Sequence, residues 1–243
     1  MKFGLQDYIL PGLVHFMAYP ATDRSDAALA SLTDLLKDTF FEVVELAGFK
    51  DPKLRANARR LLESSGIQVK YCAHPAILTQ KLNLNSLEHS ERMRAVREMQ
   101  AGINEAVELG AFDFCLLSGP YEGDIKRDES LDALEASLDE LCGYASERQV
   151  RVSLEVFDRS VDKKCLIGPA ADAKAIAQRV KKNHKDFGLV VDLSHIPLLH
   201  ESPADALRPV ADMLTHIHIG NCYCDRPDDP AYGVVSVKLR TLV

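Results

Sequence analysis

The sequence lacks features that would place it among membrane, secreted or nucleic-acid-binding proteins. It has no apolar run close to the roughly 18 residues that cross a membrane, and residues 1–7 carry no signal-peptide pattern. It also has no cationic stripe, because its 29 basic residues are outnumbered by 36 acidic ones, for a formal charge of −7. A groove that binds nucleic acid irrespective of sequence needs such a stripe. We therefore expect a cytoplasmic protein that binds neither nucleic acid nor membrane.

Cysteine is also scarce, with six residues in 243. A chain of this length does not need a disulfide framework. Cys72 and Cys115 fall in apolar runs, where we expect small core residues. Cys222 and Cys224 form C-Y-C, without the C-x-x-C spacing of a redox or zinc pair. The sequence therefore predicts no disulfide frame and no cysteine-based metal site.

A glycine-rich phosphate turn is absent as well, since no G-x-G-x-x-G and no P-loop occurs in the sequence. What is present is a regular alternation of short β-branched or aromatic runs with longer segments of helical periodicity. No linker rich in proline, glycine or serine divides the chain. The alternation predicts parallel β-α units, and we expect one α/β domain over residues 1–243. Its expected architecture is a (β/α)8-type TIM barrel, incomplete at the C-terminal end with about seven strands.

The predicted elements follow one another along most of the chain. We expect strands at 13–17, 41–46, 67–72, 112–117, 150–156, 188–193 and 214–219, and helices at about 25–38, 52–65, 88–109, 127–148, 170–183 and 203–212. Asp51 and Ser202 each precede a proline suited to the first helical position, which predicts two capped helix starts. Gly66 and Gly110 predict two helix ends.

The C-terminal segment, residues 222–243, departs from this alternation. A βαβ unit takes 30 or more residues, and only 24 remain from Gly220 onward. Residues 234–243 have strand propensity and can add at most one short strand. We therefore expect the barrel to be open between its first and seventh strands. Exposed edges of that kind favour a dimer or a larger homo-oligomer.

Three consecutive predicted strands end in side chains of the kind that bind metal ions. In a barrel, such strand ends meet at the C-terminal mouth. Glu155 lies on the fifth strand, Asp192 on the sixth, and His216 and His218 on the seventh. Each residue alone is as readily explained by an ion pair, a cap or a core histidine. Their coincidence on three strands predicts a site for a divalent ion such as Mn²⁺, Mg²⁺, Co²⁺ or Zn²⁺.

These segments resemble a known family, the sugar isomerases and epimerases with xylose-isomerase-like barrels, a group that includes D-tagatose 3-epimerase and hydroxypyruvate isomerase. The matching segments are L-E-V-F-D-R around Glu155, D-L-S-H at 192–195 and H-I-H-I-G-N at 216–221. The order of strands and helices also fits from about residue 13 to residue 221.

The resemblance implies a role for each matching residue. A divalent metal would be held by Glu155, Asp192 and His218, and Glu155 would also be a catalytic acid/base group. His195 would act beside the substrate oxygens as a catalytic and substrate-binding residue. Arg159 would lie on the substrate side.

Further candidates come from their positions at strand ends. His216 and His74 are expected on the substrate side of the mouth, and His15 is a weaker candidate there. Glu45, at the end of the second strand, is another possible carboxylate. A core or capping role explains the positions of His15 and His74 as well, and a hydrogen-bonded core role explains that of His216. An acid such as Glu45 often only orients its neighbours.

The sequence also departs from the family pattern. The epimerases carry a second glutamate on the eighth strand, and this chain has no glutamate after Glu201. They commonly have an arginine six residues after the metal histidine, where this chain has Cys224. The second catalytic carboxylate is therefore missing from its expected place.

The leading functional hypothesis is a sugar or sugar-phosphate isomerase or epimerase, acting on a small sugar or hydroxycarbonyl compound through an enediolate intermediate. One alternative is a degenerate or truncated barrel that binds metal or sugar without turnover, because the eighth-strand glutamate is missing. Another is a phosphodiesterase of the endonuclease IV type, which shares the barrel and a D-x-x-H element. The charge of −7 and the H-x-H sequence, where that enzyme has D-x-H, argue against the last.

Overall fold

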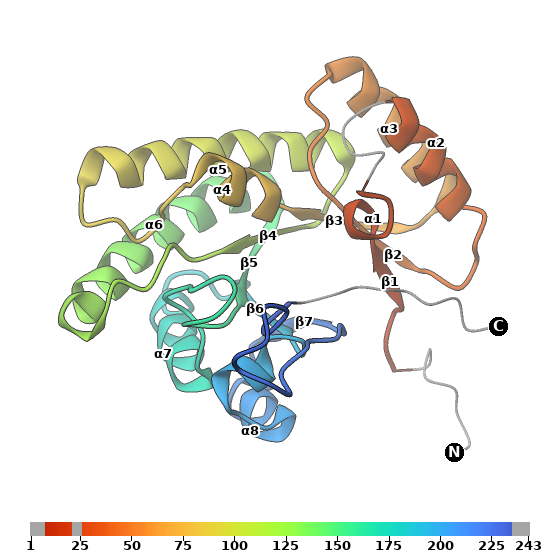
Figure 1. Cartoon of the computed structure of the whole chain (residues 1–243). Coiled ribbons are helices and arrows are strands. Elements are labelled where there is room, and N and C mark those ends of the chain that lie inside the picture. Colours follow the sequence, from red (N-terminus) through yellow and green to blue (C-terminus); the bar gives the residue numbers. More distant parts are fainter. Residues whose placement is uncertain (1–7, 21–25, 235–243) are drawn as a thin grey trace.

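Seven parallel strands form one curled sheet in the computed structural model, which describes residues 8–20 and 26–234 (Figure 1). They follow the chain order β1 to β7 across the sheet. The strands are β1 (Gly12–Val14), β2 (Val43–Leu46), β3 (Gln68–Cys72), β4 (Asp113–Leu117), β5 (Arg151–Val156), β6 (Gly188–Asp192) and β7 (Leu214–His218). Within the described residues β1 does not pair with β7. The predicted incomplete TIM barrel, open between its first and seventh strands, is confirmed.

The six predicted helices are present, and two further short ones were not predicted. The helices are α1 (His15–Ala18), α2 (Asp26–Leu35), α3 (Pro52–Ser65), α4 (His74–Gln80), α5 (His89–Leu109), α6 (Arg127–Ser146), α7 (Ala170–Val180) and α8 (Pro203–Leu207). Single 3-10 turns occupy Asp124–Lys126, Ile196–Leu199 and Arg208–Val210. No helix in the described ranges is long and apolar enough to cross a membrane.

The first strand is shorter than predicted, which changes the position of His15. The strand ends at Val14, and a single helical turn follows, closed by the bond from the Tyr19 amide to the His15 carbonyl at 2.9 Å. One turn is too short to show helical periodicity, so the sequence pattern merged it with the strand. His15 is therefore buried on α1, with its Nε2 2.9 Å from the hydroxyl of Ser31.

The predicted helix signals are confirmed by the backbone. The Asp51 side chain accepts from the Lys53 amide at 2.8 Å, and the Ser202 hydroxyl accepts from the Asp205 amide at 3.2 Å. Gly66 and Gly110 end α3 and α5 with φ angles of 73° and 78°, the left-handed region that glycine enters most cheaply. These local signals set the residues at which the helices begin and end. They therefore also set the lengths of the loops that connect these helices to the strands.

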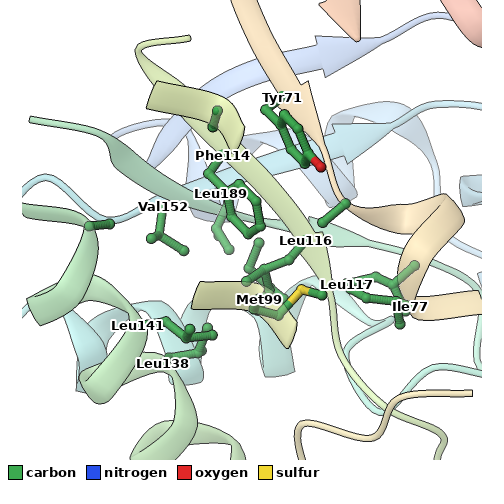
Figure 2. Packing of buried hydrophobic residues seen from close by; sticks show 14 of the residues in the cluster. Tyr71, Ile77, Met99, Phe114, Leu116, Leu117, Leu138, Leu141, Val152 and Leu189 are labelled. Atoms are coloured by element: carbon green, nitrogen blue, oxygen red, sulfur yellow. The ribbon is translucent and has the colours of Figure 1, made fainter. Parts of the chain in front are cut away.

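The main core lies between the sheet and helices α5 and α6 (Figure 2). Phe114 and Leu116 of β4 are fully buried, as are Met99 of α5 and Leu138 of α6. A Cβ on Gly102 would lie 3.0 Å from the Phe114 ring, so glycine allows α5 to approach β4 closely. Cys72 and Cys115 are buried, as predicted, and all six cysteines are free thiols.

A buried ionic cluster connects β3, β4 and β5 below the site. Asp113 is 0% exposed and Lys70 is 2% exposed, with the Lys70 Nζ 3.8 Å from Asp113 Oδ1. Arg151 Nε donates to Asp113 Oδ2 at 2.5 Å, and the Ser153 hydroxyl donates to the same oxygen at 3.0 Å. Because a charge taken out of water is costly unless it is paired, removing Asp113 alone would leave Lys70 buried without a carboxylate partner.

The C-terminal segment is described only as far as Val234. Residues 222–234 consist mainly of turns, in which Asp229 pairs with Arg226 at 2.6 Å and accepts from the Tyr223 hydroxyl at 3.2 Å. The short strand predicted within 234–243 lies almost wholly outside the described residues. In the described part, the segment adds no helix and no eighth sheet strand.

Candidate metal centre and active site

The three predicted metal ligands lie together at the carboxyl ends of three neighbouring strands. Glu155 is on β5, Asp192 ends β6 and His218 ends β7. Asp192 and His218 are direct partners in the parallel register. Each residue offers one ligand atom, and these atoms lie within 4.8 Å of one another. The closest pair is Glu155 Oε1 and His218 Nδ1, at 2.9 Å.

Asp192 is held in one orientation by the residue two positions further on. Its Oδ1 accepts from the amide of Ser194 at 2.8 Å and from the hydroxyl of Ser194 at 2.6 Å. Its Oδ2 has a longer contact, 3.8 Å from the Nε2 of His195. One oxygen of Asp192 is therefore fixed by the protein, while the other remains available as a ligand.

His218 lies between two carboxylates, Glu155 and Glu45, and the sequence did not predict Glu45 as a metal ligand. Its Nδ1 faces Glu155, and its Nε2 lies 2.8 Å from Oε1 of Glu45, a β2 residue that is 2% exposed. The same Glu45 oxygen lies 2.7 Å from His216 Nε2. A single acid inside the apolar run V-V-E-L was the sequence signal for a buried functional carboxylate.

These groups shift one another's pKa values. Burial alone would lower the pKa of His218, but the charges of Glu155 and Glu45 raise it well above its usual range. Burial would likewise raise the pKa of both carboxyls. The positive His218 outweighs this effect, holding the pKa of Glu45 well below its usual range and the pKa of Glu155 below it. These directions favour an imidazolium at His218 between two carboxylates.

His74 contacts the other oxygen of Glu155 and joins it to two buried thiols. His74 Nε2 lies 3.3 Å from Glu155 Oε2, and its Nδ1 lies 2.9 Å from the Cys72 sulfur. The Cys115 thiol donates to Glu155 Oε2 at 3.5 Å. Burial lowers the pKa of His74, and it raises the pKa of both thiols well above their usual range. The side of the site formed by His74, Cys72 and Cys115 is therefore uncharged.

His195 is held at the edge of the site by a carboxylate on the loop after β5. It is 2% exposed, and its Nδ1 lies 3.2 Å from Asp158 Oδ1. Asp158 also accepts backbone amides from residues 161, 162 and 163 at 2.8–2.9 Å. Burial would raise the pKa of Asp158, but the His195 bond and these amides hold it far below its usual range. Asp158 thus fixes the ring of His195 with its Nε2 toward Asp192.

Two other candidates contact different parts of the protein. Arg159, expected on the substrate side, pairs with Asp172, donates to the Leu166 carbonyl at 2.7 Å and stacks over Tyr121 at 4.4 Å. His15 lies on α1 against Ser31. None of the described contacts of Arg159 or His15 is to the Glu155, Asp192 and His218 cluster.

A hollow also lies elsewhere in the described chain, at the opposite ends of the strands. It has a volume of about 820 Å³ and lies around the amino ends of β5, β6 and β7, where its lining includes Arg151, Phe187 and Leu214. By contrast, the described groups that could hold a metal include Glu155 and His218, which lie at the carboxyl ends of their strands. The candidate metal ligands thus lie at the carboxyl ends of the strands, the end at which barrels of this type carry their functional groups.

Comparisons with known proteins agree with this architecture. D-psicose 3-epimerase from Clostridium cellulolyticum H10 has a TM-score of 0.72 at 18% identity, over 87% of this chain and 73% of that one. D-allulose 3-epimerase from Methylomonas sp. has a TM-score of 0.69 at 18% identity, over 87% and 72%. An AP endonuclease, family 2, from Brucella melitensis has a TM-score of 0.67 at 15% identity, over 90% and 82%. No curated protein matches the sequence.

At these identities, the structural likeness establishes the fold. The sequence itself matches the pattern of the family described as xylose isomerase-like TIM barrel over residues 34–235. This range includes all seven strands except β1 and contains Glu155, Asp192 and His218. The protein therefore belongs to the xylose isomerase-like TIM barrel family.

Proposed function

We propose that the protein is a divalent-metal-dependent isomerase or epimerase of a small sugar, a sugar phosphate or a related hydroxycarbonyl compound. The observation that carries the proposal is the convergence of Glu155, Asp192 and His218 at the carboxyl ends of β5, β6 and β7. The likeness to solved ketose 3-epimerases supports the same class of reaction.

The residues present fit a divalent ion. Two carboxylates and one imidazole form a donor set for Mn²⁺, Mg²⁺, Co²⁺ or Zn²⁺. Ser194 holds one oxygen of Asp192 and leaves the other free, and Glu155 lies beside His218. These three donors therefore converge with no ligand from a strand beyond β7. A bound ion would stabilise the negative charge that develops on the carbonyl and hydroxyl oxygens of the substrate.

Glu155 is the residue best placed to move the proton. It is buried and ionised, and its Oε2 faces the neutral His74. We expect Glu155 to take a proton from the carbon beside the substrate carbonyl, which leaves an enediolate, and to take part in its return. His195 is held by Asp158 and would donate a hydrogen bond to a substrate oxygen. His74 and His216 would line the substrate side.

A second candidate is a phosphodiesterase, which the likeness to the Brucella AP endonuclease favours. The formal charge of −7 provides little attraction for a polyanionic substrate. Incision of a duplex containing an abasic site would support this function over the isomerase.

The test is metal analysis followed by exchange of substrate protons in deuterated water, over a panel of ketoses and aldoses. We expect Glu155→Gln to slow exchange by about 10²–10⁴-fold, the usual contribution of an acid/base group. The exposed Glu63→Gln is the matched control. His195→Ala should slow exchange while metal stays bound, and loss of metal would identify His195 as a ligand.

Two results would contradict the proposal. Metal bound tightly with no proton exchange on any sugar would indicate a barrel that binds without turnover. Full exchange in Glu155→Gln would exclude Glu155 as the acid/base group.

A further inference from the structure

A second group of ligand atoms lies on the open side of the curled sheet. Oε1 of Glu45 is 2.7 Å from His216 Nε2 and 2.8 Å from His218 Nε2. The two histidines are alternate residues on β7, so their side chains leave the same face of the strand. Glu45 lies on β2, and both imidazole rings contact its carboxylate.

One atom of this group has no hydrogen-bond partner. Oε2 of Glu45 is buried and has no hydrogen-bond partner among the described residues, and Glu45 as a whole is 2% exposed. A buried acceptor without a partner destabilises the folded protein, and it does so more strongly when it is charged. A cation beside the carboxylate would remove that destabilisation. The His216 side chain is 20% exposed, which leaves a route for an ion and room for water as a further ligand.

We propose that Glu45, His216 and His218 form a second transition-metal site, distinct from the one at Glu155 and Asp192. Two imidazoles and one carboxylate suit borderline ions such as Zn²⁺ and Co²⁺ better than Mg²⁺. Three protein ligands with an open fourth position are also the pattern of a zinc site that keeps a water.

The two sites share His218, which makes them competitors. His218 faces Glu155 through Nδ1 and Glu45 through Nε2. An imidazole binds an ion through a ring nitrogen that carries no proton, and the neutral ring has only one such nitrogen, so His218 serves one ion at a time. An ion bound by Glu45 therefore withdraws His218 from the first site, and excess zinc should inhibit the proposed enzyme while binding it tightly.

An ion at the second site would also join strands that do not pair. β2 and β7 are not neighbours in the sheet, and β7 is one of its edges in the described chain. In the described chain, the contacts of Glu45 with His216 and His218 connect β2 and β7 through their side chains. Coordination would add bonds across this gap and stabilise the fold by mass action.

The experiment uses Co²⁺ as the probe and removes one site at a time. Asp192→Asn disables the first site, and we expect this variant to bind one Co²⁺ with the intense visible absorption of a four-coordinate ion. Adding His216→Ala should weaken that binding by more than about 100-fold, because loss of a ligand costs more than loss of an outer-shell partner. Adding His89→Ala, an exposed histidine on α5, should leave the binding unchanged.

A separate variant covers the case in which His216→Ala does not fold. Glu45→Gln keeps the shape of the side chain, and in the Asp192→Asn background it should weaken Co²⁺ binding to a similar extent. Circular dichroism establishes that each variant is folded.

The outcomes separate the two metal proposals. If Asp192→Asn binds no Co²⁺ while the unaltered protein binds one, the second site is wrong and the first one stands. If the His216 and Glu45 changes leave Co²⁺ bound to Asp192→Asn, the second site is also wrong. If Asp192→Asn binds Co²⁺ as expected but the unaltered protein shows no proton exchange, the proposed function fails and the second site stands.

Discussion

The Ser194 hydroxyl donates a 2.6 Å hydrogen bond to Asp192 Oδ1, and the Ser194 amide donates a second to the same atom at 2.8 Å. Outer-shell partners of this kind orient a ligating carboxylate, and removing one typically costs about 10–100-fold in metal affinity. We expect Ser194→Ala to weaken Mn²⁺ or Co²⁺ binding toward the lower end of that range, because the amide bond remains. Calorimetric titration measures this. Ser64→Ala, an exposed serine on α3, is the control, and equal affinities in the two variants would contradict the assignment.

Acid sensitivity should depend on Asp158. Its pKa is depressed in the folded protein, so its stabilisation is complete above the unfolded pKa of about 3.9 and is lost as the pH falls below that value. We expect Asp158→Asn to destabilise the protein by about 1–3 kcal/mol at pH 7. The difference from the unaltered protein should shrink toward pH 3. Urea unfolding at several pH values tests this, and a constant difference would show that Asp158 acts only through packing.

The ionic cluster at Asp113 should be costly to break and cheap to replace as a whole. Asp113→Ala leaves Lys70 buried without its carboxylate, and we expect a loss of about 3–5 kcal/mol in the free energy of unfolding. The double variant Asp113→Leu with Lys70→Met should lose less than Asp113→Ala does. Denaturant unfolding measures both, and a double variant as unstable as the single one would contradict this view of the cluster.

The free thiols should differ sharply in reactivity. Burial raises the pKa of Cys142 and of Cys165 to about 12, so few thiolates form at pH 8. Cys224 is exposed. We expect alkylation followed by mass spectrometry to label Cys224 first, and Cys142 and Cys165 only on unfolding. Early labelling of Cys142 in the folded protein would indicate local opening of α6.

Local patterns in the sequence predicted the sheet, all the described helices except the short α1 and α4, and the strand ends that carry Glu155, Asp192 and His218, because each depends on neighbours in the chain. The partner of His216 could not be predicted in this way. Its contact with Glu45 depends on how far the sheet curls, which is set by packing over the whole domain. The same limit applies to Arg159, whose ion pair with Asp172 involves a side chain at the start of α7.

The contact between Glu45 and His218 also has a consequence for folding kinetics. Each strand pairs with the strand before or after it in the chain, whereas this contact joins residues 173 positions apart. Contacts of large sequence separation pay the largest loop-closure entropy and tend to form late. The β-α units can therefore assemble progressively along the chain, and the cluster at Glu45 is complete only when β7 has docked. Completion of the proposed site at Glu45 and His218 would thus be a late step of folding, and an ion that needs both residues would bind only after β7 has docked.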